Sequence, residues 1–273
     1  MAAMFYGAVK FNQSIDDWDT SLVTTMSQMF YNVQDFNHPL NNWNTSKVNF
    51  MAEMFRGATD FNQDLNSWDT SLVTSFNSMF YGATNFNGNI SSWNTSKANN
   101  FFAIFYGATN FNQPLNSWDT SLVTGMGNAF YSASSFNQPL DNWNTSKVNS
   151  INGMFQSASL FNQNLSTWDL SNVDSLQAMF YFATNFNGNI SSWNTSKVTN
   201  MQQTFSQADS FDQDIGSWNT SLVTNMNSMF YSANVFNQNI SQWCVPLIGS
   251  EPSLFATSSA LVEGNKPNWG TCP

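Results

Sequence analysis

The chain has 273 residues, a formal net charge of −10 and only 9% charged residues. Lysine and arginine together number seven and form no cluster, which argues against binding of nucleic acid through phosphate contacts. The sequence has no run of about 18 apolar residues, so we expect no transmembrane segment.

A 25-residue unit recurs without insertion or deletion as far as Trp243. Phenylalanines begin at Phe5 and at Phe11 and return at that interval, and so does a tryptophan that begins at Trp18. A fixed period of this length predicts a solenoid, in which each coil contacts only its neighbours. The chain starts within a repeat and shows no signal peptide, which predicts that a leader or an amino-terminal cap has been removed.

Each repeat first suggests a short strand and a bend. In residues 11–15 the sequence F-N-Q-S-I places Phe11 and Ile15 on one face of an extended segment. Both columns remain apolar in every repeat, which indicates a core face, and Trp18 follows where the chain is expected to bend.

A short helix is the next predicted element. Asp19-Thr20-Ser21 resembles a helix N-terminus, because short oxygen-bearing side chains cap free amides. Val23, Met26, Met29 and Phe30 then follow at spacings of three and four, with a glycine after this stripe at 7, 57, 82 and 107. The expected fold class is therefore an α/β repeat: a solenoid of about ten coils, each with a short strand plus a short helix or 3-10 turn.

Two polar columns hardly vary, the asparagine column that begins at Asn12 and the serine column that begins at Ser21. They form either a ladder of ligand contacts or a set of side chains that satisfy backbone groups where the coil turns. We favour the second interpretation.

The repeat resembles that of the BspA-like leucine-rich-repeat surface proteins, in their Trp/Met-rich branch. The motifs that carry the resemblance are W-[DN]-T-S-x-V and M-F-x-x-A, in register over residues 1–243. The resemblance implies a right-handed solenoid, an extracellular or surface location, and adhesion or recognition. It transfers no catalytic residue.

Residues 244–273 are predicted to form a separate C-terminal cap that covers the open end of the solenoid formed by residues 1–243. The tail keeps the repeat weakly: the Val column holds Ile248, the Met column holds Leu254, and the two Phe columns hold Phe255 and Leu261. Cys244 and Cys272 are too few and too far apart for most metal or redox sites, so a disulfide and an oxidising compartment are expected.

All the tyrosines occupy one column, which elsewhere holds Arg56, Gln156 and Ser206 and is therefore expected to be exposed. The row binds a glycan or a protein, or it only covers the edge of the helical stripe. Its members are Tyr6, Tyr31, Tyr81, Tyr106, Tyr131, Tyr181 and Tyr231.

Nothing in the sequence predicts an enzyme, a metal site or a cofactor. His38 is the single histidine, and the chain has no nucleophile motif, phosphate loop or cluster of metal ligands. The leading hypothesis is a secreted or cell-surface recognition and adhesion solenoid whose partner is an extracellular protein or glycan; the oligomeric state is not predicted.

Two alternatives remain open, a structural spacer or stalk and an ice-binding protein. Ice binding would use a regular threonine row that stands at one position of the coil. That row consists of Thr20, Thr45, Thr70, Thr95, Thr120, Thr145, Thr195 and Thr220.

Overall fold

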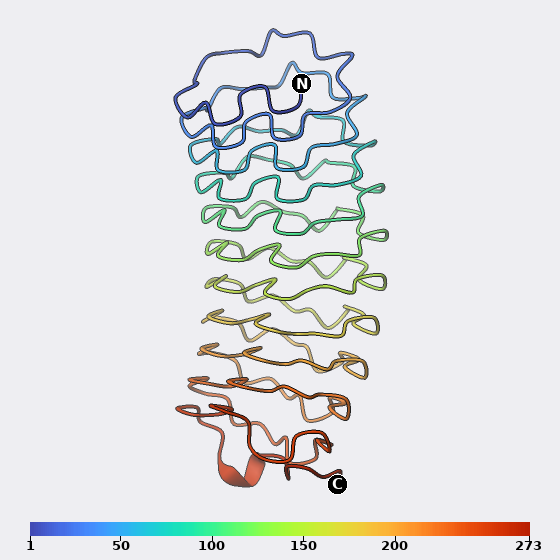
Figure 1. Ribbon diagram of the computed structural model, residues 1–273, viewed down its shortest axis with the longest axis vertical. Coiled ribbons are helices and arrows are strands. Elements are labelled where there is room, and N and C mark those ends of the chain that lie inside the picture. Colours follow the sequence, from blue (N-terminus) through green and yellow to red (C-terminus); the bar gives the residue numbers. More distant parts are fainter.

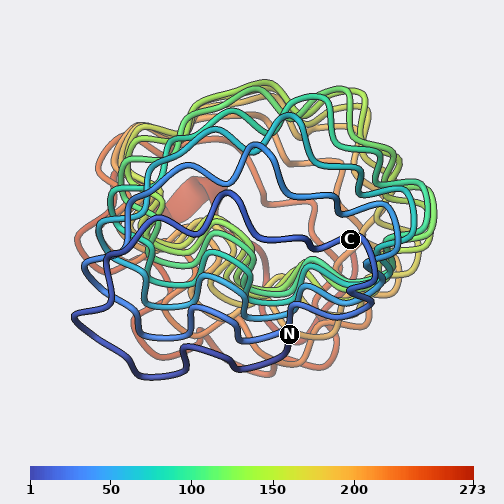
Figure 2. The same cartoon turned by 90° about the horizontal axis from the view of Figure 1, so that it is seen from above.

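The computed structural model describes residues 1–273, which wind into coils stacked along one long axis (Figure 1). The two termini lie at opposite ends of the stack. Viewed from above, successive coils follow nearly the same flattened outline (Figure 2). Residues 25 positions apart therefore lie above one another, and each column of the sequence becomes a ladder along the stack.

The coils contain no helix and no extended strand. The one regular element is the 3-10 helix η1, Glu263–Asn265, near the C-terminus. Neighbouring coils share isolated parallel β-bridges such as Thr25↔Phe50 and Phe50↔Ser75, and all 120 backbone hydrogen bonds lie outside helices and strands. The predicted α/β fold class, with a strand and a helix in every coil, is therefore wrong.

Consecutive β-turns occupy the segment where a helix was expected. The Met29 amide donates to the Met26 carbonyl at 3.2 Å, and the Val33 amide donates to the Phe30 carbonyl at 3.1 Å. The third residue of each turn has a positive φ, 58° at Gln28 and 55° at Asn32, as a type II turn requires. Successive turns repeat every three or four residues, so they bury the same columns as a helix would.

The remaining amides of this segment bond to the next coil. Gln28 donates to the Ala52 carbonyl at 3.0 Å and Phe30 to the Met54 carbonyl at 2.9 Å. Because alternate amides point along the stack, they are unavailable for the i to i−4 bonds of a helix. Hydrogen bonding between coils therefore replaces local secondary structure.

The predicted helix N-terminus is an Asx turn. The Ser21 amide donates to Asp19 Oδ1 at 3.0 Å, and the Ser46 amide donates to Asn44 Oδ1 at 3.1 Å in the next coil. The asparagine column forms a ladder in which the Asn62 amide donates to Asn37 Oδ1 at 2.9 Å. The ladder confirms that the asparagine column satisfies backbone groups. The serine hydroxyls instead bond to side chains, as Ser46 Oγ donates to Asn44 Oδ1 at 2.7 Å.

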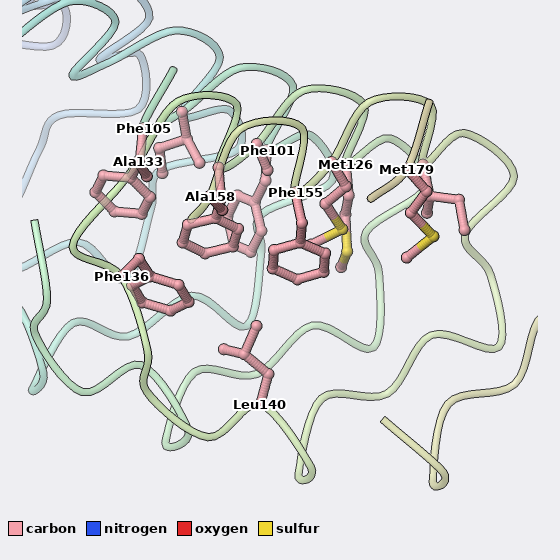
Figure 3. Close-up of a cluster of buried hydrophobic side chains, with 14 of the residues drawn as sticks. Phe101, Phe105, Met126, Ala133, Phe136, Leu140, Phe155, Ala158 and Met179 are labelled. Atoms are coloured by element: carbon pink, nitrogen blue, oxygen red, sulfur yellow. The ribbon is translucent and has the colours of Figure 1, made fainter. Parts of the chain in front are cut away.

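The interior is one continuous hydrophobic cluster of 76 buried residues. Figure 3 shows part of it, where Phe105, Phe136, Phe155 and Leu140 point into the same interior. Phe130 and Phe155 of adjacent coils stack with ring centroids 5.6 Å apart. Trp143 Nε1 donates to the Leu115 carbonyl of the preceding coil at 3.0 Å, so the indole joins two coils while it fills the core.

The tail continues the stack but is one residue out of step. In the repeats the Phe205 amide donates to the Met229 carbonyl 24 residues ahead, whereas the Phe230 amide donates to Phe255. Phe255 thus takes the place of a methionine, and Leu254 is 50% exposed. The prediction that these two residues keep the Met and Phe columns is wrong.

A disulfide joins Cys244 to Cys272, as predicted. Lys266 holds a second part of the tail, because its Nζ lies 2.9 Å from both Glu251 Oε1 and Glu263 Oε2. Burial alone would lower the pKa of Lys266, but the hydrogen bonds to these two carboxylates outweigh it and raise that pKa.

Candidate functional site

The threonine row proposed as an ice-binding face lies inside the molecule. Its side chains, from Thr20 to Thr220, are only 0% to 2% exposed. Each hydroxyl donates to a carbonyl of the next coil, as from Thr120 to Asn144 at 3.0 Å. This row therefore presents no surface to ice, and its hydroxyls serve to join coils.

The tyrosine row lies at the surface, with rings stacked face to face. Ring centroids are 4.4 Å apart for Tyr6 and Tyr31, 4.3 Å for Tyr81 and Tyr106, and 4.2 Å for Tyr106 and Tyr131. The rings are parallel within 8°. Because each inner ring covers the face of its neighbour, the row exposes ring edges and hydroxyls rather than flat faces.

Arg56 fills the first interruption of the column. Its guanidinium carbon lies 4.1 Å from the Tyr81 ring centroid and 5.5 Å from that of Tyr31, so a cation–π contact continues the stack on both sides. We call the resulting unbroken series from Tyr6 to Tyr131 the tyrosine row.

Beyond Tyr131 the stack breaks. Gln156 replaces the next tyrosine and donates from Nε2 to the Tyr131 hydroxyl at 3.2 Å. Ser206 is buried, at 1% exposure, and separates Tyr181 from Tyr231. The sequence-predicted residues Tyr181 and Tyr231 therefore do not join the tyrosine row.

Tyrosine hydroxyls are uncharged near neutral pH because the ordinary pKa of a phenol is about 10. Burial is the main cause that raises the pKa of Tyr106, followed by its hydrogen bond and charge interaction with Tyr131. The row is thus a rigid series of neutral hydroxyls with one cation, on a protein whose net charge is −10.

The side chain of His38 bonds only to the Asn12 carbonyl, at 3.1 Å. No group of three or more His, Cys, Asp or Glu side chains could hold a metal ion. The structure contains no helix that is long and apolar enough to cross a bilayer.

Sequence reasoning missed a small hollow beside Gln156, of about 180 Å³. The one sequence signal for it is the place where glutamine replaces tyrosine in the column. Its lining residues are Asn128, Asn152, Gly153, Gln156, Gln177 and Ala178.

Comparison with known proteins identifies a family but no characterised relative. A family model described as Mycoplasma protein of unknown function, DUF285, matches residues 1–83, 89–181 and 158–269. No curated protein matches the chain significantly. Because the three matches together span most of the 25-residue repeats and much of the tail, the protein belongs to this repeat family.

Proposed function

We propose that the protein is a secreted or cell-surface recognition module that binds an extracellular protein or glycan through the tyrosine row. The observation that supports this most is the unbroken stack from Tyr6 to Tyr131, with Arg56 included. Tyrosine and arginine are the residues that most often dominate binding energy at protein interfaces.

The row is suited to binding because it is already ordered. Stacking fixes each ring, so little side-chain entropy remains to be lost when a partner binds. Most other polar ladders are used internally: the Thr120 hydroxyl bonds to the next coil, and the Asn37 carboxamide oxygen accepts a backbone amide. The tyrosine hydroxyls recur along the surface without such a backbone role. Another exposed column does the same but bonds within itself, as Asn85 Nδ2 donates to Asp60 Oδ1 at 3.4 Å.

The disulfide between Cys244 and Cys272 supports a location in an oxidising compartment. Ice binding loses its basis because the threonine row is buried. A spacer or stalk role remains a second candidate, favoured by the continuous core along a straight stack (Figure 1). A stalk predicts end-to-end assembly, which light scattering would detect.

The binding test uses substitutions that the column already tolerates. Tyr106→Gln and Tyr81→Gln place in the row the residue that stands naturally at Gln156. Binding of the purified protein to cells, to protein arrays and to glycan arrays is measured at several salt concentrations. Leu122→Gln, at an exposed position of another column, is the matched control.

We expect the tyrosine variants to lose binding by about tenfold or more, as is usual for central aromatic residues of an interface. The control should bind like the unmodified protein. Unchanged binding by both tyrosine variants would contradict the role of the row, and absence of any bound surface, protein or glycan would contradict recognition itself.

A further inference from the structure

The tyrosine column is interrupted at Gln156, and the surface that tyrosine rings cover in other coils is open there. Tyr106 stacks on one side of the Tyr131 ring, but the next position along the stack holds only the Gln156 carboxamide. Tyr181, one coil beyond, has no aromatic ring stacked above or below it in its own column, and Phe182 contacts it at a tilt. Two aromatic rings therefore flank a gap one coil wide.

The hollow of about 180 Å³ opens beside this gap. Asn152 Oδ1 lies buried at the hollow and is the one buried side-chain polar atom without a hydrogen-bond partner. In the following coils the same column is satisfied, since Asn200 Nδ2 donates to Gln177 Oε1 at 3.2 Å. An unpaired buried acceptor is rare, and less than 1 Å² of this oxygen is exposed, so a donor from outside the chain reaches it only when the Asn152 side chain turns toward the hollow that it lines.

Gly153 gives the hollow its shape. A β-carbon at this position would lie 2.3 Å from Asn128 Oδ1, so only glycine leaves room for that carboxamide. The backbone has a φ of 61°, which glycine adopts without strain. The carboxamide oxygens of Asn128 and Asn152 therefore come from neighbouring coils to the same hollow.

The chemistry of the lining selects the class of ligand. No lining residue carries a charge, so the hollow has neither the carboxylates that Ca²⁺ prefers nor a cation for an anionic group. Carboxamides offer donors and acceptors together, which suits a compound with several hydroxyls. The volume is well below the 300 Å³ or so of pockets for drug-sized ligands, so the ligand is small or is one unit of a polymer.

We infer that this hollow binds one neutral sugar residue, whose hydroxyls bond to the carboxamides that line it, including that of Asn152 once its side chain turns into the hollow. The inference rests on the proposed function and gives it a ligand class: a neutral glycan that is anchored at Gln156 and extends along the tyrosine row.

The chain itself supplies matched variants. Gln156→Tyr restores the repeat residue, closes the gap between Tyr131 and Tyr181, and fills the space beside the hollow. Leu122→Tyr introduces a tyrosine at an exposed position of another column, which does not line the hollow, and serves as control. Asn152→Ala removes the unpaired acceptor and introduces the residue found in the same column at Ala52.

Binding is measured by ligand-observed saturation-transfer NMR on the full chain, with maltose, cellobiose, lactose and chitobiose as probes. We expect at least one disaccharide to bind the unmodified protein and the Leu122→Tyr variant alike. Gln156→Tyr and Asn152→Ala should lower the affinity by about tenfold or more. Thermal unfolding of each variant confirms that it is folded, and Gln156→Tyr should melt no lower than the unmodified protein.

The inference is overturned if no probe binds, or if folded Gln156→Tyr binds as well as the unmodified protein. Either result is distinguishable from failure of the proposed function. Gln156→Tyr leaves the tyrosine row intact, so cell or protein binding that is lost in Tyr106→Gln but kept in Gln156→Tyr would uphold the proposed function without the sugar site.

Discussion

The middle coils and the tail of residues 244–273 extend the same core by different means. In the middle, every coil repeats the same bonds to its neighbours, such as Trp143 Nε1 to the Leu115 carbonyl and the Thr120 hydroxyl to the Asn144 carbonyl. Both ladders end where the tail begins, with the bond from Trp243 Nε1 to the Ile215 carbonyl and the bond from the Thr220 hydroxyl to the Cys244 carbonyl. The tail is one residue out of step, and a disulfide and the ion pairs of Lys266 hold it.

This difference shows what repetition provides. A middle coil meets identical partners on both sides, so side-chain shape and hydrogen bonds alone fix its position. The tail has a neighbour on one side only, and a segment with half the contacts needs another constraint to remain ordered. A covalent bond supplies it by restricting the unfolded chain. Substitutions in the two regions should therefore differ in how much stability they remove and in how many coils they affect.

The largest effect is expected from Trp143→Ala in the middle of the stack. The substitution removes a buried indole and one of the two donors to the Leu115 carbonyl, which keeps only the Trp118 amide. The free energy of unfolding should fall by about 3–5 kcal/mol, as for other large-to-small substitutions of buried aromatics. Urea denaturation followed by circular dichroism measures the change. Trp269→Ala in the tail is the control, because Trp269 is partly exposed and packs edge-on against Phe255; an equal loss there would contradict the comparison.

The double substitution Cys244→Ser with Cys272→Ser tests the constraint on the tail. Loss of a disulfide that closes a loop of this size lowers the free energy of unfolding by about 3 kcal/mol in the chain-entropy model. We expect a lower melting temperature and more aggregation, since the apolar end of the core becomes accessible, while hydrogen exchange shows the middle coils still folded.

A thiol assay on the folded, unmodified protein comes first, and two reactive thiols would refute the bond. Unchanged melting and solubility of the double variant would refute the capping role even if the bond is present.

Thr120→Val should have a smaller effect. Valine keeps the shape of threonine, but the Asn144 carbonyl loses its donor, which costs about 1 kcal/mol. The change in free energy of unfolding is measured by urea denaturation. The control is Leu170→Val, at a position of the same column that has no hydroxyl. If both variants lose the same stability, the loss comes from packing and the hydrogen bond contributes nothing.

Asp69→Asn should change stability least and should reveal a pH dependence. Hydrogen bonds from the hydroxyl and the amide of Ser71 lower the pKa of Asp69 below its ordinary value. Because the pKa is lower in the folded state, the carboxylate stabilises the fold at pH values above the pKa of the unfolded state. This stabilisation is lost as the pH falls through the folded-state pKa, below about pH 4.

Asparagine makes the same turn at Asn94, so the variant should match the unmodified protein at pH 7 and lose less stability in acid. Urea midpoints between neutral and acidic pH measure this. Equal acid sensitivity of both proteins would show that the Asp69 carboxylate adds nothing.

The sequence alone determined the period, the core columns and the disulfide. A column that stays apolar through ten coils, like that of Phe30 and Phe55, has to be buried. Two cysteines outside the repeat, with no further metal ligands nearby in the sequence, are expected to bond to each other. The same internal comparison identified the asparagine column as a support for the backbone, because a side chain bound to its own stack tolerates little change.

Only the tertiary structure decided how each coil is built and which polar rows reach solvent. Spacings of three and four residues suit a helix and a run of type II turns equally. A positive φ at a non-glycine residue such as Gln28 cannot be recognised from the sequence. Thr20 is buried and Tyr6 is 54% exposed, although both belong to regular columns. The reason is that the partner of each side chain is a backbone group or a ring one coil away, and only stacking brings the two together.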